Sequence, residues 1–316
     1  MNLRSFLNRT MLSANDIKRT ALELGFSACG LAKVEPATSE IAYYDQWIAK
    51  GYQAGMHYME NHRAIRLHPE GLLEGARTII SVALNYYPAQ LLPPEAPQIA
   101  YYAYGKDYHI VVKERLRQLW KALGEPAEMR CFTDSAPLFE RYWAWKAGLG
   151  WMGKNGNLIL PHQGSFFFLG EILTTEEADH YDQPQRDRCG TCRRCLDACP
   201  TGALEEARCL NANKCLSYLT IEHRGELPAE QATRLGNRLY GCDTCQLVCP
   251  WNRFAEPTSI AEFQPTEAFL SLDDTLLDGF SQADYQRLFA HSAVKRAKYE
   301  GLLRNSRALL ATKKLL

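Results

Sequence analysis

The sequence predicts an α+β chain in three parts: a mixed helix-and-strand domain, a cysteine-rich domain and a short helical C-terminal region. Strand-like and helix-like segments alternate over roughly the first 175 residues. Most of the 11 cysteines fall between Cys189 and Cys249, and the chain after Pro265 has a helical pattern. We place the three parts at residues 1–178, 179–260 and 261–316.

Local patterns predict the elements of the first part. Ser13 and Asp16 are typical of a helix start and Gly25 of a helix stop, so residues 13–25 should form a helix. Helical spacing of apolar residues recurs at 111–123. β-branched and aromatic runs predict strands at 26–34, 77–87 and 165–174. The proline-rich stretch 91–97 should be a loop, and the polar stretch 174–188 a linker.

Composition excludes some classes of protein. Lys plus Arg and Asp plus Glu both number 36, so overall charge favours no nucleic-acid partner. No apolar run approaches the ~18 residues of a membrane span, and the polar N-terminus does not resemble a signal peptide. We therefore expect a cytoplasmic protein. Disulfides are disfavoured in that compartment, so grouped cysteines there indicate metal or redox chemistry.

The first cysteine motif is Cys189-x2-Cys192-x2-Cys195-x3-Cys199-Pro. It matches the C-x2-C-x2-C-x3-C-P run of bacterial two-cluster ferredoxins, in which the fourth cysteine binds the other cluster. The spacing therefore predicts a bacterial-ferredoxin-like domain with two [4Fe–4S] clusters.

The second motif, Cys242-x2-Cys245-x3-Cys249-Pro, repeats the pattern without its first cysteine. The two motifs supply seven ligands, whereas two clusters need eight. Cys209 and Cys215 are both candidates for the eighth. Structural zinc also uses C-x2-C pairs, but paired zinc knuckles do not call for the C-x3-C-P extension twice.

A glycine-rich stretch from Met129 to Leu160 is the candidate site for a large flat ligand, because glycine lets the backbone approach closely. Within it, Asp134 precedes Ser-Ala-Pro. Surrounding aromatic residues could raise its pKa enough for it to deliver a proton at neutral pH. The more common role of an aspartate in such a sequence is to cap a helix or a turn.

Seven motifs carry a resemblance that extends from about Leu22 to Leu303. The chain resembles the epoxyqueuosine reductases, cobalamin-dependent enzymes that complete queuosine in tRNA. The motifs are FTDSAP (132–137), KAGLGWMGKNGNLIL (146–160), GSFFFLGEIL (164–173), CGTCRRCLDACPTGAL (189–204), CLSYLTIEHRG (215–225), NRLYGCDTCQLVCPWNR (237–253) and LLRN (302–305).

The resemblance implies a base-off cobalamin in the N-terminal domain, Asp134 as the proton donor and Cys215 as the eighth ligand. One cluster would then be held by Cys189, Cys192, Cys195 and Cys249, and the other by Cys199, Cys215, Cys242 and Cys245. It also implies the reaction: electrons pass from the clusters to cobalamin, and the epoxide of epoxyqueuosine at the tRNA wobble position loses its oxygen in a two-electron reduction.

Polar residues and glycines near the motifs are our candidates for corrin contacts, although each is equally suited to a scaffold role. They are Arg141, Gly153, Lys154, Asn155, Asn157, Ser217 and Asp243. Asp107-Tyr108-His109 begins like the D-x-H-x-x-G motif of proteins that bind cobalt through histidine. Val112 stands at the glycine position, so we do not expect His109 to bind cobalt.

The resemblance implies a tRNA anticodon stem-loop as partner, with its modified base splayed into the pocket. Arg224, Arg234, Arg238 and the basic stretch 290–316 are either phosphate contacts or solvated helix faces. We also expect an external one-electron donor, such as flavodoxin or ferredoxin, and a monomer. The family often continues into a helical tail, so a chain ending at Leu316 is a short or a truncated member.

Two other functions compete with this interpretation. A cobalamin-dependent reductive dehalogenase would use the same cofactors on small halogenated compounds, but such enzymes are usually exported. A ferredoxin-type electron-transfer protein would hold iron and sulfide without cobalt, and it would not need the 175 or so additional N-terminal residues.

Overall fold

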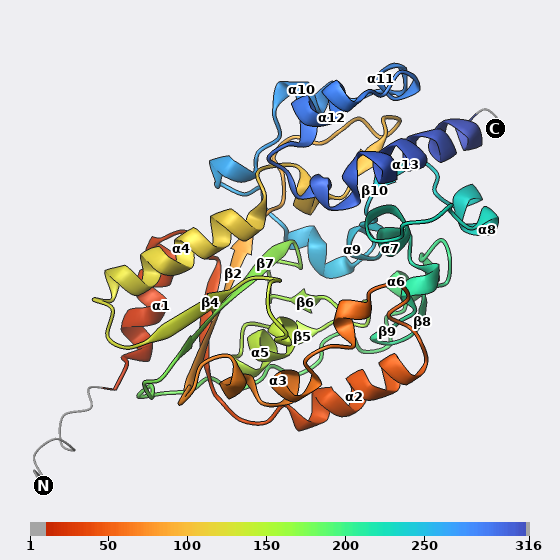
Figure 1. The fold of residues 1–316 in the computed structure, drawn as a ribbon. Coiled ribbons are helices and arrows are strands. Elements are labelled where there is room, and N and C mark those ends of the chain that lie inside the picture. The colour runs from red at the N-terminus through yellow and green to blue at the C-terminus, as the bar shows by residue number, and fades with distance from the viewer. Residues whose placement is uncertain (1–10, 314–316) are drawn as a thin grey trace, which may run out of the picture.

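The centre of the molecule is a four-stranded antiparallel sheet. The computed structural model describes residues 11–313 (Figure 1). The strands lie in the order β1-β2-β7-β4, with β1 at Ala28–Lys33, β2 at Thr78–Asn85, β7 at Phe167–Thr174 and β4 at Met129–Phe132. Every neighbouring pair is antiparallel. The sequence predicted β1, β2 and β7 and missed the short edge strand β4.

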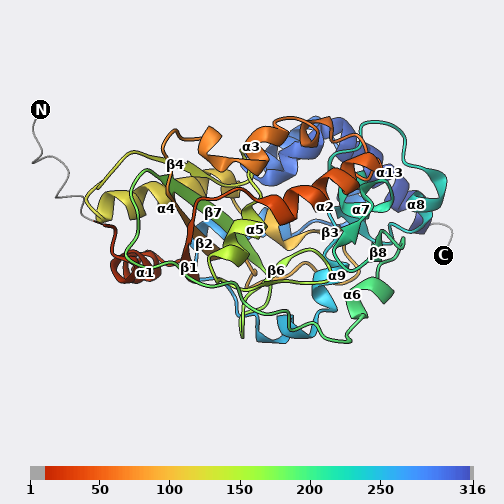
Figure 2. The same ribbon diagram turned by 90° about the horizontal axis from the view of Figure 1, so that it is seen from below.

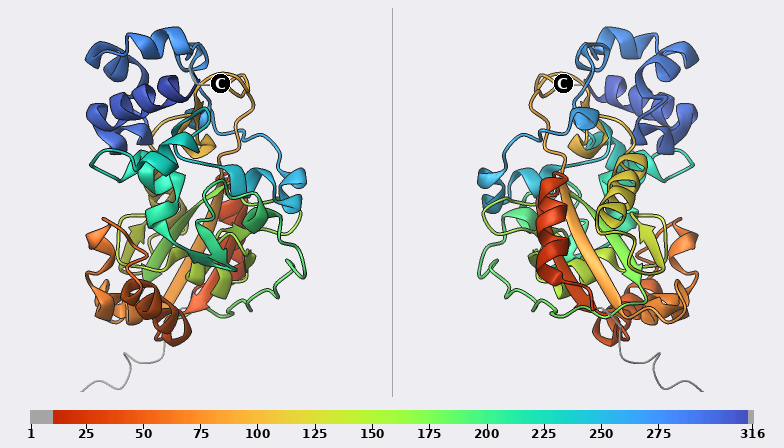
Figure 3. Two further views of the ribbon diagram at one scale, coloured as in Figure 1. Left: turned by 90° about the vertical axis from the view of Figure 1, so that its right-hand side faces the viewer. Right: turned by 90° about the vertical axis from the view of Figure 1, so that its left-hand side faces the viewer.

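Helices cover both faces of this sheet. α1 (Ala14–Glu23) and α4 (Tyr108–Ala122) lie side by side on one face, as the right-hand view of Figure 3 shows. α5 (Glu140–Lys146) packs on the other face, where Trp143 is fully buried. Because both faces are covered, β2 is buried along almost its whole length, as its apolar sequence requires.

Two side-chain caps set where the long helices begin. The Ser13 hydroxyl accepts a hydrogen bond from the Asp16 amide at the start of α1, which confirms the predicted helix start. The Asp107 carboxylate accepts one from the His109 amide at the start of α4. Helix α4 therefore begins three residues before the predicted segment, and Tyr108 becomes its first residue.

The cysteine-rich part consists mainly of loops and short elements. The stretch 175–188 has no helix or strand, and Asp182 within it donates its amide to the carbonyl oxygen of Leu31; its role as a linker stays a prediction. A parallel pairing of β10 (Arg238–Tyr240) with β3 (Gln98–Ile99) connects this part to the N-terminal part. The elements are α6 (Arg194–Asp197), β8 (Leu204–Glu206), β9 (Cys209–Leu210), α7 (Leu216–Ile221), α8 (Ala229–Thr233), β10 (Arg238–Tyr240) and α9 (Thr244–Leu247).

The C-terminal part is helical, as predicted, and it is bound to the cysteine-rich part. Asn305 is completely buried and donates to the carbonyl oxygens of Thr220 and Leu239. One hydrophobic core contains residues from all three parts, among them Ile17 and Leu309. The predicted domain boundaries stay predictions. The helices are α10 (Glu267–Leu270), α11 (Asp274–Asp278), α12 (Gln282–Phe289) and α13 (Lys298–Lys313).

Several further elements carry or adjoin residues of the site. They are α2 (Thr38–Ala49), the 3-10 helix η2 (His57–Met59), α3 (Arg63–Leu67), η4 (Tyr101–Ala103), β5 (Trp151–Met152), β6 (Leu158–Ile159), η6 (Pro250–Phe254) and η8 (Ala293–Ala297). Over residues 11–313, none of the helices combines the length and apolar character that crossing a membrane would require.

Candidate functional site

A first set of four thiols gathers around a cavity of about 100 Å³. Cys189, Cys192, Cys195 and Cys249 all line it. Burial raises the pKa of Cys195, and negative charge on Cys189 and Cys249 raises it further. Burial also raises the pKa of Cys249, and negative charge on Cys189 and Cys192 raises it further. The structure thus brings a cysteine of the second motif to the first three cysteines of the first motif.

A second set of thiols forms around Cys215. The pKa of Cys215 is raised to about 11. Burial is the largest cause, and negative charge on Cys242 and Cys199 contributes to the same shift. The pKa of Cys245 is raised by burial and by Cys242 and Cys215. Each of the two motifs therefore contributes to both sets, in the crossed arrangement that the first motif predicted.

Cys209 lies elsewhere. It lies in β9, and the carbonyl oxygen of the preceding residue, Arg208, accepts a hydrogen bond from the hydroxyl of Tyr43 in helix α2. Sequence spacing left Cys209 and Cys215 open as candidates for the eighth ligand. The structure places Cys215, and not Cys209, among the other cysteines.

The chemistry of the two sets fits [4Fe–4S] clusters better than zinc. Each set contains four thiols, which is the ligand set of a four-iron cluster. Thiolates that bind one zinc ion converge on a point ~2.3 Å from each sulfur. Among the residues that the structure describes, no three His, Cys, Asp or Glu side chains converge as they would around a single ion.

The β5–β6 hairpin is fastened to the cysteine loops. The Lys154 ammonium donates to the carbonyl oxygens of Gly190 and Cys192, at 2.6 and 2.9 Å. Asn155 donates to the carbonyl oxygen of Cys245 at 3.2 Å. Two residues that the sequence suggested as corrin contacts thus hold the loops of both thiol sets against the N-terminal part.

The other suggested corrin contacts differ in their exposure and in whether other residues of the chain already contact them. Asp243 is bound to the Tyr101 amide at 2.7 Å, and burial raises its pKa to about 6. A Cβ atom at Gly153 would meet Ile159 and Asn155, so packing within the protein explains this glycine. Arg141 is exposed and donates to the Gly156 carbonyl oxygen, while Asn157 and Ser217 are half-buried.

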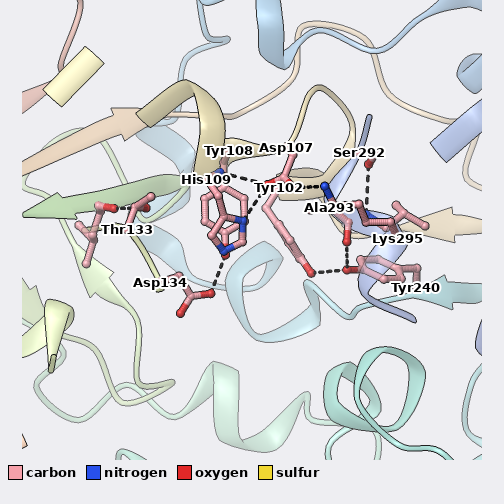
Figure 4. Close-up of polar contacts among 12 residues, drawn as sticks. Tyr102, Asp107, Tyr108, His109, Thr133, Asp134, Tyr240, Ser292, Ala293 and Lys295 are labelled. Carbon is pink, nitrogen blue, oxygen red and sulfur yellow. Dashed lines mark hydrogen bonds and ion pairs between the residues drawn. The ribbon is translucent and has the colours of Figure 1, made fainter. Parts of the chain in front are cut away.

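Asp134 lies in the loop that follows β4, where the backbone is in the left-handed region with φ +47°. Few residues other than glycine adopt this conformation, which costs roughly 1–3 kcal/mol. Two contacts hold it. The Tyr108 hydroxyl donates to Asp134 Oδ2 at 2.6 Å (Figure 4). The Asp134 amide donates to Glu140 Oε1. The Asp134 carboxylate is itself exposed.

Glu140, the first residue of α5, lies close to a second carboxyl group. Burial raises the pKa of Glu140, and negative charge on Asp134 raises it further. Glu171 in β7 is fully buried on the same face of the sheet. Burial raises the pKa of Glu171 well above its ordinary value, and none of the described residues forms a hydrogen bond with its Oε1 atom. Within residues 11–313, the Ser81 hydroxyl, at 2.5 Å, is the one donor to its other oxygen.

The residues around Tyr108 fix its ring. It stacks on Phe168 with ring centroids 4.3 Å apart. Hydrogen bonds from His109 and Lys295 oppose the effect of burial and hold the pKa of Asp107 below its usual range. The His109 ring is thereby paired with Asp107 through Nδ1. Lys295 belongs to η8, so the C-terminal part takes part in positioning Tyr108 (Figure 4).

A second tyrosine pair lies beside Tyr108. Tyr102 packs edge-on against the Tyr108 ring and donates its hydroxyl hydrogen to Tyr240 at 2.9 Å. Tyr240 donates in turn to the carbonyl oxygen of Ala293 (Figure 4). These contacts connect η4, β10 and η8, one element from each of the three predicted parts.

Tyr58 and Arg296 mark the open side of the Asp134 region. Tyr58 is 48% exposed, and its pKa is raised by burial and by negative charge on Glu222 and Asp134. The Arg296 guanidinium lies 5.6 Å from the centre of the Tyr58 ring and forms a bidentate pair with Glu222. An exposed aromatic ring with a cation on it therefore lies near the Asp134 carboxylate.

The arginines suggested as phosphate contacts have other partners. Arg224 donates to the carbonyl oxygens of Ile221 and Arg296, and Arg234 donates to that of Pro200. Arg238 donates to Thr244 Oγ1 at 2.7 Å. In the basic C-terminal stretch, Arg304 likewise donates to backbone carbonyl oxygens; Lys314 lies outside the described residues. Holding loops together is a role that the sequence did not indicate.

Comparison with known proteins agrees with this geometry. Residues 188–252 match the 4Fe-4S double cluster binding domain, and residues 66–135 match the family described as epoxyqueuosine reductase QueG, DUF1730. An epoxyqueuosine reductase of Leadbetterella byssophila is 44% identical over 296 residues, which cover 92% of this chain and 96% of that protein. The chain belongs to the epoxyqueuosine reductase family.

Other epoxyqueuosine reductases are also similar to this chain in sequence and in structure. The Salmonella typhimurium protein is 40% identical over 92% of this chain and 78% of its own length. An epoxyqueuosine reductase solved with an epoxyqueuosine-modified stem loop of tyrosine tRNA is 32% identical, with a TM-score of 0.86 over 95% of this chain and 81% of that chain. The Bacillus subtilis structure, also 32% identical, has a TM-score of 0.84 over the same shares and is described with an aspartate-bearing catalytic loop swung out of the active site.

In this epoxyqueuosine reductase family member, sequence reasoning proposed Asp134 as a site residue but did not indicate the residues that contact it. Tyr108 lies 26 residues away and Glu140 six residues away. The only signal for Tyr108 was its place in the Asp-Tyr-His segment, which we had considered for cobalt binding. Tyr58 and Arg296 gave no signal, because nothing in their local sequence connects them to Asp134.

Proposed function

We propose that this chain reduces epoxyqueuosine to queuosine at the wobble position of tRNA anticodons, with two [4Fe–4S] clusters and a base-off cobalamin. The observation that carries this proposal is the arrangement of Asp134, exposed and held by Tyr108 and Glu140, in a chain that also gathers two sets of four thiols. Relatives named for this activity match 92% of the chain.

We assign the cluster ligands from the two thiol sets. Cys189, Cys192, Cys195 and Cys249 would bind one cluster, and Cys199, Cys215, Cys242 and Cys245 the other. When bound, the clusters and cobalamin would supply the electrons and the reducing metal for the reaction. Arg141, Asn157 and Ser217 would contact the amide and phosphate groups of cobalamin. Gly153, Lys154, Asn155 and Asp243 would support this site by holding the cysteine loops and the hairpin.

The overall reaction takes up two electrons and two protons. Both carbon–oxygen bonds of the epoxide break, a carbon–carbon double bond forms, and the oxygen leaves as water. Asp134 would protonate that oxygen. Because the Tyr108 hydroxyl occupies Oδ2, a neutral Asp134 would carry its proton on Oδ1, which is the oxygen left free for the substrate.

Tyr108 and Glu140 would act by positioning Asp134. The left-handed backbone at Asp134 is costly, and the hydrogen bond from the Asp134 amide to Glu140 supports it. Tyr108 is itself held by stacking and by the Asp107 cap. The proton donor would therefore be fixed before the substrate arrives, which is how enzymes lower the cost of orienting a catalytic group.

The modified base would enter beside Tyr58. Exposed aromatic rings next to cations are typical stacking platforms for RNA bases. Tyr58 and Arg296 form such a platform near Asp134. We also propose that the protein acts as a monomer in the cytoplasm, where its tRNA substrate is found, and that an external one-electron carrier such as flavodoxin or ferredoxin reduces it.

Product analysis tests this function directly. The protein is reconstituted anaerobically with iron, sulfide and cobalamin, and is given a stem-loop that carries epoxyqueuosine together with a chemical reductant. Mass spectrometry of the digested nucleosides should show queuosine, with the mass of one oxygen atom lost. Unchanged epoxyqueuosine from protein with full iron content and corrin absorption bands would contradict the proposal.

A further inference from the structure

A second feature of the cysteine-rich part faces solvent. A surface hollow of about 800 Å³ lies between α6 and η6. Its lining includes Arg194, Leu247, Val248, Cys249, Pro250 and Arg253. Nothing in the proposed reaction at Asp134 uses this hollow.

The chemistry of the hollow is that of a protein-binding surface. Leu247 is 53% exposed, one of few large apolar side chains so open to solvent in the described part of the chain. Arg194 and Arg253 beside it are exposed as well. The one acidic lining residue, Asp197, is paired with Arg193 at 3.4 Å. An apolar centre with a charged rim is the usual composition of an interface, and the positive rim favours an acidic partner.

The hollow borders the first thiol set. Arg194, Cys249 and Pro250 line both the hollow and the cavity enclosed by Cys189, Cys192, Cys195 and Cys249. A partner seated in the hollow would therefore be separated from that cavity by a single layer of residues. Weak redox complexes use small contact areas of this kind.

The hollow also lies away from the open side of the Asp134 region. Figure 2 shows α6 and α9 at one edge of the molecule and α3, which follows Tyr58 in the chain, at the opposite edge. Tyr58 is an exposed residue whose pKa is raised in part by the negative charge of Asp134. A protein at the hollow and an RNA at Tyr58 would therefore not compete for the same surface.

We propose that this hollow docks the electron donor, an acidic one-electron carrier protein whose redox group lies at its surface. The inference rests on the proposed function. It adds where on this chain the electron donor binds and that the donor is acidic. Arg194 and Arg253 would attract the carrier, and Leu247 with its neighbours would form the contact that excludes water.

Binding measurements on the reconstituted protein test this proposal without relying on turnover. Flavodoxin, an acidic carrier, is titrated into the protein by calorimetry at low and at high salt. The double variant Leu247→Asp/Arg253→Glu should weaken binding at least tenfold, because it removes the apolar contact and reverses one charge. Binding by the wild type should also weaken with salt.

A matched double variant, Ile110→Asp/Arg117→Glu, makes the same changes on α4, where Ile110 is 49% exposed. It should bind flavodoxin like the wild type. Equal weakening by both double variants would overturn the proposal, as would flavodoxin binding that is unaffected by the hollow variant. Loss of affinity for the epoxyqueuosine stem-loop in the hollow variant would instead make the hollow an RNA-binding surface and would also overturn it.

Turnover with a small chemical reductant separates this proposal from the proposed function. The hollow variant should still convert epoxyqueuosine when dithionite supplies the electrons, and it should lose at least tenfold in rate when reduced flavodoxin does. Failure of the wild type with dithionite would contradict the proposed function, whereas the binding result would still decide whether the hollow docks a carrier.

Discussion

The hydroxyl of Tyr108 donates a hydrogen bond to one carboxylate oxygen of Asp134, with Tyr108 Oη and Asp134 Oδ2 2.6 Å apart. Tyr108 is the first residue of α4, and Asp134 lies in the loop after β4. The contact connects the two elements around the proposed proton donor. It leaves one carboxylate oxygen of Asp134 for the substrate.

We expect Tyr108→Phe to lower kcat by roughly tenfold to a hundredfold, because a hydrogen bond to a charged or reacting group contributes about 1.5–3 kcal/mol. Binding of the stem-loop should not change. The control is Tyr102→Phe, which removes a neighbouring hydroxyl that donates to Tyr240 and not to Asp134. Full activity in Tyr108→Phe, or equal losses in both variants, would remove Tyr108 from the mechanism.

Glu140 gives a second test of positioning. Glu140→Ala removes the acceptor of the Asp134 amide, so kcat should fall about tenfold or more while KM changes little. Glu140→Gln keeps an oxygen at the same place and should recover most of the rate. If Glu140→Gln were as slow as Glu140→Ala, the hydrogen bond from the Asp134 amide would not be what matters.

Glu171 makes stability depend on pH. Its pKa in the folded state is raised above its ordinary value of 4.5 by burial. The folded state therefore holds the proton more tightly than the unfolded state, so stability contributed by this group is greatest near and below pH 4.5 and is lost as pH rises toward the raised pKa. Glu171→Gln cannot ionise and should avoid this loss.

The advantage of Glu171→Gln over the wild type should grow with pH by up to ~1.4 kcal/mol per pH unit. Urea unfolding of both proteins at pH 5, 6 and 7 measures the difference, and comparison at each pH removes contributions that they share. A constant difference across this range would show that Glu171 is ionised in the folded protein.

The sequence predicted the elements whose signals are local. Ser13, Asp16 and Gly25 marked α1, and apolar runs marked β1, β2 and β7. It missed β4, which is only four residues long and has two of its side chains only partly buried and one exposed. It also missed α5, because an amphipathic pattern is hard to recognise in seven residues rich in aromatic side chains.

Cysteine spacing predicted the motifs but not the full ligand set. Seven thiols followed from two short repeats, whereas the choice between Cys209 and Cys215 depended on how the chain between the repeats folds. The residues around Asp134 show the same limit. Tyr108 contacts Asp134 from a distant segment, and the charge of Asp134 acts on Tyr58 from another; single-sequence patterns carry no information on such relationships.

The cysteine choice can be tested by iron content. Cys215→Ser should lose one cluster, about four of the eight irons expected after anaerobic reconstitution, while Cys209→Ser should keep both. Iron analysis and electron paramagnetic resonance of the reduced proteins would report the number of clusters. Equal losses in the two variants, or a loss in Cys209→Ser alone, would contradict the ligand assignment.

Tyr58 tests the proposed base platform. Tyr58→Ala should weaken stem-loop binding by about 1–3 kcal/mol, roughly fivefold to 150-fold, because base–aromatic stacking contributes this much. Tyr58→Phe keeps the ring and should bind like the wild type. Binding by fluorescence anisotropy at fixed salt measures both. Unchanged affinity in Tyr58→Ala would exclude this residue from the RNA interface.

The central claim is that Asp134 delivers a proton to the epoxide of a bound tRNA base. Single-turnover reactions of reconstituted wild-type protein and Asp134→Asn with the epoxyqueuosine stem-loop test it most directly. We expect queuosine from the wild type, and from Asp134→Asn a rate at least about a hundredfold lower with unchanged stem-loop affinity and cobalamin content. Conversion by Asp134→Asn at the wild-type rate would contradict the claim.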